Sequence, residues 1–139
     1  MELKRVVVTG LGAVTPVGNT PEETWKNLLE GKSGAASITH FDTTLFKTKF
    51  ACEVKDLNLN DYIDRKEARK MDRYCQLAMV SAAQGIKDAG LDLEKEDLNR
   101  IGVVYGVGIG GIKTFQDEVV YYGQHEDQGP KFNPFFINI

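Results

Sequence analysis

The fold is decided first by residues 5–12, which read Arg5-Val6-Val7-Val8-Thr9-Gly10-Leu11-Gly12. A run of valines is typical of a short strand buried in a sheet, because β-branched side chains pack well on a pleated surface. The two glycines then permit a tight turn. A helix start follows, with Thr20 as cap, Pro21 at the first helical position and Glu23 three residues after the cap. We expect this helix to end at Gly31.

The clearest helical signal follows Asp64, a residue type that often caps helices. From there to Ala89, apolar side chains recur at steps of three and four residues, which predicts one continuous helix with an apolar stripe. Gly90 then ends it. The small residues of the stripe allow another element to approach closely. The stripe consists of Ala68, Met71, Cys75, Ala78, Met79, Ala82, Ile86 and Ala89.

Three other segments complete the expected elements. Residues 100–107 are rich in valine and isoleucine, as in a second buried strand, and we expect a helix at residues 112–122. Residues 49–54 alternate loosely, which we interpret as a third strand. Strands that alternate with helices indicate an α/β fold with a largely parallel sheet. A sheet of two or three strands is too small to form a complete domain when both of its faces are buried. We therefore expect residues 1–139 to be an incomplete segment of a larger domain.

The composition argues against several classes of protein. Hydrophobic residues make up 42% and charged residues 27% of the 139 residues, as in soluble globular proteins. The formal net charge of -3, with dispersed lysines and arginines, argues against a nucleic-acid partner. There is no run of about 18 apolar residues that could insert into a membrane. The N-terminus also lacks the pattern of a signal peptide, so the expected location is cytoplasmic.

The cysteines and histidines do not predict a metal site or a disulfide framework. Cys52 and Cys75 are too few for such a framework and form no Cys-x-x-Cys pair. We interpret both as inert thiols, Cys75 in the middle of the long helix. His40 and His125 stand alone in the sequence, and we expect them on the surface or in turns.

The glycine-rich loop leaves a dinucleotide-binding hypothesis open. A strand, a glycine loop and a helix can hold a pyrophosphate on backbone N–H groups. Gly10 and Gly12 fit the start of that pattern, but Thr15 stands where the third glycine belongs. The helix also begins too late, near Pro21, to offer its N-terminus to a phosphate. The simpler interpretation is that the glycines allow a tight turn.

Five motifs carry a resemblance to a known family. In chain order they are Val6-Val7-Val8-Thr9-Gly10-Leu11-Gly12-Ala13-Val14-Thr15-Pro16-Val17-Gly18; Ser33-Gly34 with Phe41-Asp42; Arg69-Lys70-Met71-Asp72-Arg73; Gly106-Val107-Gly108-Ile109-Gly110-Gly111; and Gly129-Pro130-Lys131 with Pro134-Phe135-Phe136. This order, over essentially the whole chain, resembles the N-terminal portion of the elongating β-ketoacyl-acyl-carrier-protein synthases, most of all those of the synthase II type.

The resemblance implies a thiolase-like layered α/β fold, of which this chain holds part of the N-terminal half. It implies a homodimer, and a fatty-acid condensing activity that joins an acyl group to malonyl-acyl-carrier-protein with loss of carbon dioxide. The family uses a cysteine nucleophile and two histidines and needs no cofactor. None of the cysteines or histidines in this chain matches those positions, so we expect the catalytic residues to lie outside it and the segment alone to be inactive.

The resemblance also implies roles for residues within the chain. Ile109 matches a residue that lines the acyl pocket, and Phe136 matches one that reaches the pocket of the partner subunit. Docking of the acidic acyl carrier protein requires an exposed basic patch. The matching basic residues are Lys66, Arg69, Lys70 and Lys131. Three of these lie in the first turns of the expected long helix, where cations oppose the helix dipole, which favours a role other than stability.

A second hypothesis is a non-catalytic, truncated homologue that dimerises or binds carrier protein. A dinucleotide-binding module is a third. The segment alone would expose the edge of its sheet and its apolar C-terminus, which predicts aggregation when it is isolated.

Overall fold

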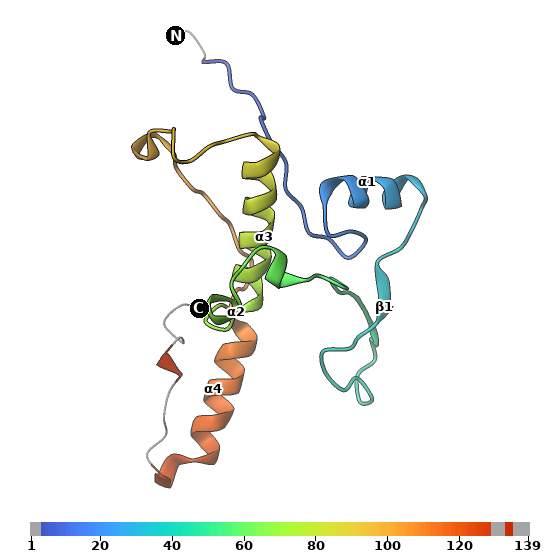
Figure 1. Cartoon of the computed structure of the whole chain (residues 1–139). Coiled ribbons are helices and arrows are strands. Elements are labelled where there is room, and N and C mark those ends of the chain that lie inside the picture. The colour runs from blue at the N-terminus through green and yellow to red at the C-terminus, as the bar shows by residue number, and fades with distance from the viewer. Residues whose placement is uncertain (1–3, 129–132, 135–139) are drawn as a thin grey trace. The chain divides into compact units, whose positions relative to one another are not determined.

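The computed structural model describes residues 4–128, 133 and 134 (Figure 1). The chain forms two compact units, the first from residues 1–58 and 80–96 and the second from residues 59–79 and 97–139. Helix α3 (Arg73–Asp88) contributes its C-terminal part to the first unit and its first seven residues to the second. Among residues 4–128 and 133–134, no helix combines the length and the apolar character needed to cross a membrane.

Helix α1 (Pro21–Leu29) in the first unit begins and ends where the sequence predicts. Thr20 is its N-cap, and the N–H of Glu23 donates to the Thr20 hydroxyl at 3.2 Å. The Glu23 carboxylate accepts from the N–H of Asn19 at 2.7 Å, one residue before the usual partner in a capping box. Gly31 has φ of 69°, in the left-handed region that favours glycine after a helix.

The first unit also contains a small antiparallel sheet. Strand β1 (Ala35–Ser37) pairs with strand β2 (Phe50–Cys52), with Ala36 opposite Ala51. The third strand expected at residues 49–54 is therefore present in shorter form. Its partner β1 has no pattern that predicts a strand.

The glycine-rich segment crosses α3 at Ser81 and Gly85. A Cβ on Gly12 would lie 1.9 Å from the carbonyl oxygen of Ser81, and one on Gly10 would lie 2.4 Å from that of Gly85. The two backbones are therefore in direct contact, which only residues without a Cβ allow. Of the apolar stripe expected to admit another element, only Ala89 lies in this contact, beside Gly10, whereas Ser81 and Gly85 are not members of that stripe.

Polar side chains of α3 fix this crossing. The Asp88 carboxylate accepts from the N–H of Leu11 at 2.8 Å, and the Gln84 amide oxygen accepts from the N–H of Ala13 at 3.0 Å. The Gln84 amide nitrogen donates to the carbonyl oxygen of Asn19 at 2.7 Å. Backbone groups of a loop far away in sequence thus find their partners on one helix.

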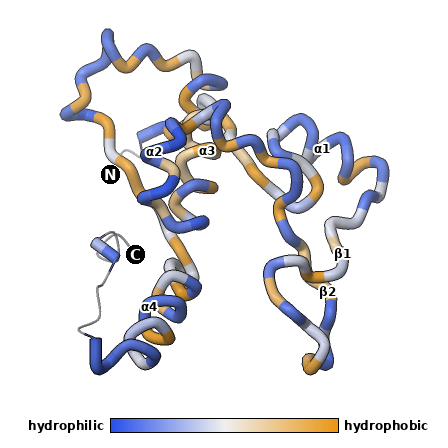
Figure 2. Tube along the Cα trace, turned by 60° about the horizontal axis from the view of Figure 1, so that its bottom comes forward, coloured by the Kyte–Doolittle hydropathy of each residue, from blue (hydrophilic) through white to orange (hydrophobic). Residues whose placement is uncertain are grey.

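Besides the start of α3, the described residues of the second unit form five helical elements. They are the 3₁₀ helix Leu59–Asp61, α2 (Arg65–Ala68), the 3₁₀ helix Leu98–Arg100, α4 (Ile112–Gln124) and the 3₁₀ helix Glu126–Gln128. Helix α4 confirms the helix expected at residues 112–122. Figure 2 shows hydrophobic and hydrophilic residues alternating along α4.

The single long helix expected from Asp64 to Ala89 is wrong, because the chain leaves the helical path between α2 and α3. Asp64 does cap α2, accepting from the N–H of Lys66 at 2.8 Å. The amide nitrogen of Gln76 donates to the carbonyl oxygens of Ala68 at 2.9 Å and Met71 at 3.3 Å. A side chain of α3 thus binds one carbonyl oxygen at the end of α2 and one in the connecting turn.

The strands expected at residues 5–9 and 100–107 are not formed in the described part of the chain. Their valines are exposed, Val6 to 89%, Val8 to 80% and Val104 to 100%. A strand needs a hydrogen-bonded neighbour, and strand propensity largely reflects packing against such neighbours. The described residues form one two-stranded antiparallel sheet, so the largely parallel sheet expected from the sequence is also wrong.

The crossing predicts a selective effect of added methyl groups. Gly12→Ala places a Cβ against the Ser81 carbonyl, and we expect it to lower the free energy of unfolding by about 2 kcal/mol, the usual scale for overpacking. Chemical unfolding of the complete gene product measures this. Gly85→Ala is the matched control, because its Cβ would meet its neighbours at 3.7 Å or more and alanine favours the helix. Equal destabilisation by both variants would contradict the crossing.

Candidate functional site

A basic cluster, defined as Lys66, Arg69 and Lys70, lies on α2 and the turn after it. The side chains of Lys66 and Arg69 are exposed and have no ion-pair partner in the part of the chain that the structure describes. Lys70 pairs with Glu67 at 2.5 Å, and because both groups are exposed this pair contributes little stability. Two cationic side chains of the cluster are therefore open to an acidic partner.

The local fold explains how the basic cluster is held. Ile63 and Ala68 are buried and anchor α2 on both sides of Lys66. Because α2 has only four residues, its dipole is small. The unfavourable position of these cations at the start of one long helix was an argument for a docking role. That argument no longer applies, because the long helix is not formed. The exposure of the cations is the observation that remains.

Ile109 lies in the loop before α4 and its side chain is 76% exposed, so the described residues do not enclose it. The loop is held immediately after this residue. Gly110 lies against the ring of Tyr74, where an added Cβ would be 2.9 Å from a ring carbon. Gly111 has φ of 68° and is the N-cap of α4. The backbone that carries Ile109 thus depends on two successive glycines.

A hydrogen bond joins α4 to the start of α3. The Thr114 hydroxyl donates to the Asp72 carboxylate at 2.5 Å. Tyr74 lies two residues further along, and its pKa is raised, first by a side-chain hydrogen bond with Cys75 and then by burial and by the charges of Cys75 and Asp72. Its phenol therefore stays neutral and serves as a packing surface for Gly110.

Sequence reasoning did not single out Tyr74, Asp72 or Thr114 as part of the site. The only available signal was that Asp72 belongs to the motif at residues 69–73. Two of the predicted site residues, Phe136 and Lys131, lie outside the described residues.

The cysteines occupy different local environments. Cys52 is the last residue of β2 and is exposed, whereas Cys75 is half-buried. The mid-helix position expected for Cys75 is wrong, because α3 begins at Arg73 and Cys75 is its third residue. In the described ranges, no three His, Cys, Asp or Glu side chains gather closely enough to hold a metal ion.

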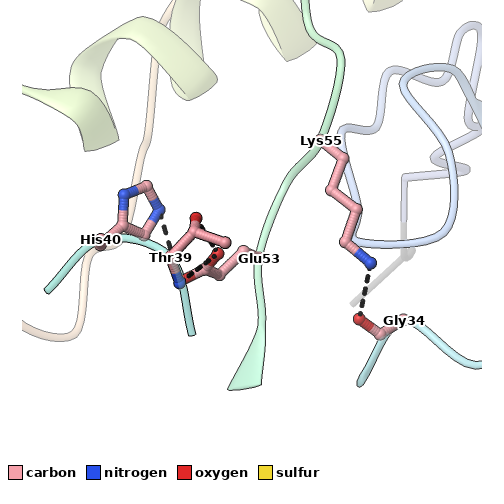
Figure 3. Close-up of polar contacts among 5 residues, drawn as sticks. All are labelled: Gly34, Thr39, His40, Glu53 and Lys55. Carbon is pink, nitrogen blue, oxygen red and sulfur yellow. Dashed lines mark hydrogen bonds and ion pairs between the residues drawn. The ribbon is translucent and has the colours of Figure 1, made fainter. Parts of the chain in front are cut away.

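His40 and Thr39, in the connection between β1 and β2, lie against the carboxylate of Glu53 (Figure 3). The Glu53 carboxylate accepts from the Thr39 hydroxyl at 2.7 Å and from the Thr39 N–H at 3.0 Å. The ring of His40 lies 3.8 Å from the same carboxylate. The hydroxyl of Thr39 is the main cause that lowers the pKa of Glu53. Nearby, the Lys55 ammonium donates to the carbonyl oxygen of Gly34 at 3.5 Å.

His125 lies at the end of α4. Its ring stacks on Tyr121 with centroids 4.3 Å apart, and its Nδ1 lies 2.9 Å from the Tyr121 carbonyl oxygen. Both histidines therefore occupy local structural positions, as expected from the sequence.

The geometry of the glycine-rich segment does not support dinucleotide binding. The backbone N–H groups of Leu11 and Ala13 already donate to side chains of α3. A pyrophosphate would need such groups free and aimed at it. Close packing against a helix, rather than ligand binding, accounts for Gly10 and Gly12.

Residues 3–138 match the family model described as the N-terminal domain of β-ketoacyl synthase. The chain belongs to this family. It is 46% identical over 135 residues to 3-oxoacyl-[acyl-carrier-protein] synthase 2 of Staphylococcus aureus (strain COL), covering 96% of this chain and 32% of the relative. It is 44% identical over 138 residues to the synthase 2 of Synechocystis sp., covering 99% of this chain and 32% of the relative.

Solved structures agree with this membership in the β-ketoacyl synthase family. The ishigamide ketosynthase/chain length factor matches with a TM-score of 0.77 and 28% identity, over 94% of this chain and 32% of that one. A type II polyketide ketosynthase in complex with its acyl carrier protein matches with a TM-score of 0.76 and 27% identity, over 97% of this chain and 34% of that one. The chain thus spans about one third of the length of the relatives that it matches.

The hairpin contact predicts a specific change in titration. Thr39→Val removes the hydroxyl that binds the Glu53 carboxylate, so we expect the pKa of Glu53 to rise toward its ordinary value. A lowered folded-state pKa contributes stability that is present above the unfolded-state pKa and is lost as the pH falls through the folded-state pKa. The variant should therefore lose part of this contribution at neutral pH.

Carbon-detected NMR titration of the complete gene product measures the pKa of Glu53. Thr44→Val is the matched control, because the Thr44 hydroxyl binds Asp42 and that bond lowers the pKa of Asp42 instead. An unchanged pKa of Glu53 in Thr39→Val, or the same rise in the pKa of Glu53 in the control, would show that the Thr39 hydroxyl does not lower this pKa.

Proposed function

We propose that the complete gene product is a condensing acyltransferase. In this reaction an enzyme thiolate takes the acyl group from the thioester of its carrier, and the carrier thiol leaves. Malonyl-acyl-carrier-protein then loses carbon dioxide, and the resulting carbanion displaces the enzyme thiolate from the acyl group to give 3-oxoacyl-acyl-carrier-protein. The observation that carries the proposal is the 46% identity, over 96% of this chain, to enzymes named 3-oxoacyl-[acyl-carrier-protein] synthase 2.

In this proposal the present chain contributes binding surfaces rather than the reacting groups. Ile109 lines the acyl pocket, with Phe136 reaching the pocket of a partner subunit in a homodimer. The basic cluster, together with Lys131, docks the acidic carrier protein. Two exposed cations without ion-pair partners in the described residues, Lys66 and Arg69, support the docking role.

Fatty-acid elongation is favoured over polyketide synthesis. The identity is 44–46% to the synthase 2 enzymes of Staphylococcus aureus and Synechocystis. It is 27–28% to the two structural relatives, of which one is a polyketide ketosynthase. We therefore propose saturated acyl chains on acyl carrier protein as the substrates.

A coupled assay of the complete gene product tests the proposal. Acyl-carrier-protein and malonyl-carrier-protein are supplied together, and the 3-oxoacyl product and carbon dioxide are quantified. Equal amounts of both products support the proposal. Tight carrier binding without either product would instead favour the non-catalytic homologue, and absence of both binding and product would overturn the assignment.

Charge reversal tests the docking surface. We expect Lys66→Glu and Arg69→Glu each to raise the KM for the acyl carrier protein about tenfold, because each places a negative charge where an acidic partner must bind. The kcat for a short acyl-pantetheine thioester, which lacks the carrier protein, should stay unchanged. Lys95→Glu is the control, since Lys95 is an exposed lysine of the other unit. A similar rise in KM for this control would contradict a localised docking surface.

A further inference from the structure

Within the described residues, the loop that carries Ile109 makes close contacts on its C-terminal side only. An added Cβ on Gly108 would meet nothing within 4 Å, whereas one on Gly110 would meet the ring of Tyr74 at 2.9 Å. Gly111 then adopts the left-handed conformation that begins α4. The described residues therefore leave open space beside the preceding glycine and place close contacts after Ile109.

The restraints that follow come from the first turns of α3 and α4. Tyr74 packs on Gly110, and Asp72 binds the Thr114 hydroxyl at 2.5 Å. Asp72 and Tyr74 are two residues apart, and their partners Thr114 and Gly110 are four residues apart. Together they fix both the position of the loop and the start of α4 relative to α3.

We propose that Tyr74 and the Asp72–Thr114 hydrogen bond are positioning elements that set which acyl-chain lengths the site accepts, acting through the loop that carries Ile109. This inference rests on the proposed function, in which Ile109 lines the acyl pocket. The proposed function assigns the reacting groups to residues outside this chain, so both contacts act through the loop. Their effect is to hold Gly110 and Gly111, and hence the backbone of Ile109, in one place.

The Asp72–Thr114 hydrogen bond can be removed with less change in shape than the Tyr74 contact. The partner of the Thr114 hydroxyl is a carboxylate, and hydrogen bonds to charged acceptors are stronger than those between neutral groups. Valine has nearly the shape of threonine but cannot donate, whereas serine keeps the hydroxyl. The pair Thr114→Val and Thr114→Ser therefore separates the hydrogen bond from the space that the side chain fills.

The test compares the complete gene product and its variants on acyl carrier protein loaded with a short or a long saturated chain. The quantity measured is the ratio of kcat/KM for the long chain to kcat/KM for the short chain. We expect Thr114→Val to change this ratio about fivefold or more, because the loss of a hydrogen bond to a charged group loosens the loop. Thr114→Ser should restore it to within about twofold of the original ratio.

Lys113→Ala is the matched control. Lys113 precedes Thr114 and forms an exposed ion pair with Asp117 at 2.7 Å on the same helix. Its loss should leave the chain-length ratio unchanged. A change in the control as large as that in Thr114→Val would overturn the proposal, because general loosening of α4 would then explain both.

Tyr74→Ala keeps the test decisive if Thr114→Val fails to fold. This variant opens space beside Gly110, and we expect it to change the same ratio. Active variants with the original ratio would overturn the positioning role while leaving the condensing function intact. A complete gene product that forms no 3-oxoacyl product on either chain would instead contradict the proposed function itself.

Discussion

The close crossing of two backbones in the first unit is the constraint on which its local structure depends. Gly10 and Gly12 lie so near the carbonyl oxygens of α3 that a single added methyl group would overlap them. Asp88 and Gln84 then accept from the loop N–H groups, so the same contact that excludes side chains also satisfies backbone donors. This explains why a loop with the composition of a phosphate-binding motif has a packing role.

A second constraint acts where α2 ends and α3 begins. The Gln76 amide compensates for the interruption of the helix by donating to carbonyl oxygens of the preceding turn. The interruption brings two features onto neighbouring residues: the basic cluster ends at Lys70, while Asp72 binds Thr114 in the first turn of α4 and Tyr74 packs on Gly110 beside Ile109. The docking surface and the acyl-pocket loop of the proposed function are thus built on one short stretch of chain.

Sequence reasoning predicted the features that a few neighbouring residues determine. The cap at Thr20, the stop at Gly31 and the helix from Ile112 depend on local contacts, and the structure confirms them. The break after Ala68 was missed because it involves neither proline nor glycine and because the apolar stripe continues through it. The strands expected at residues 5–9 and 100–107 were wrong for a different reason, since a strand requires a paired segment that a local pattern does not specify. The site was predicted in part: the resemblance identified Ile109 and the basic cluster, but the hydrogen bond from Thr114 joins residues 42 positions apart and leaves no pattern in the sequence.

The proposed function depends on covalent acyl transfer by the complete gene product. Its most direct test is the intact mass of the complete gene product after incubation with acyl carrier protein that holds a saturated acyl chain, with malonyl carrier protein left out. The account predicts a mass increase of one acyl group per subunit, which disappears when malonyl carrier protein is added. An unchanged mass, in a folded protein that still binds the carrier, would contradict the condensing function and favour a non-catalytic member of the family.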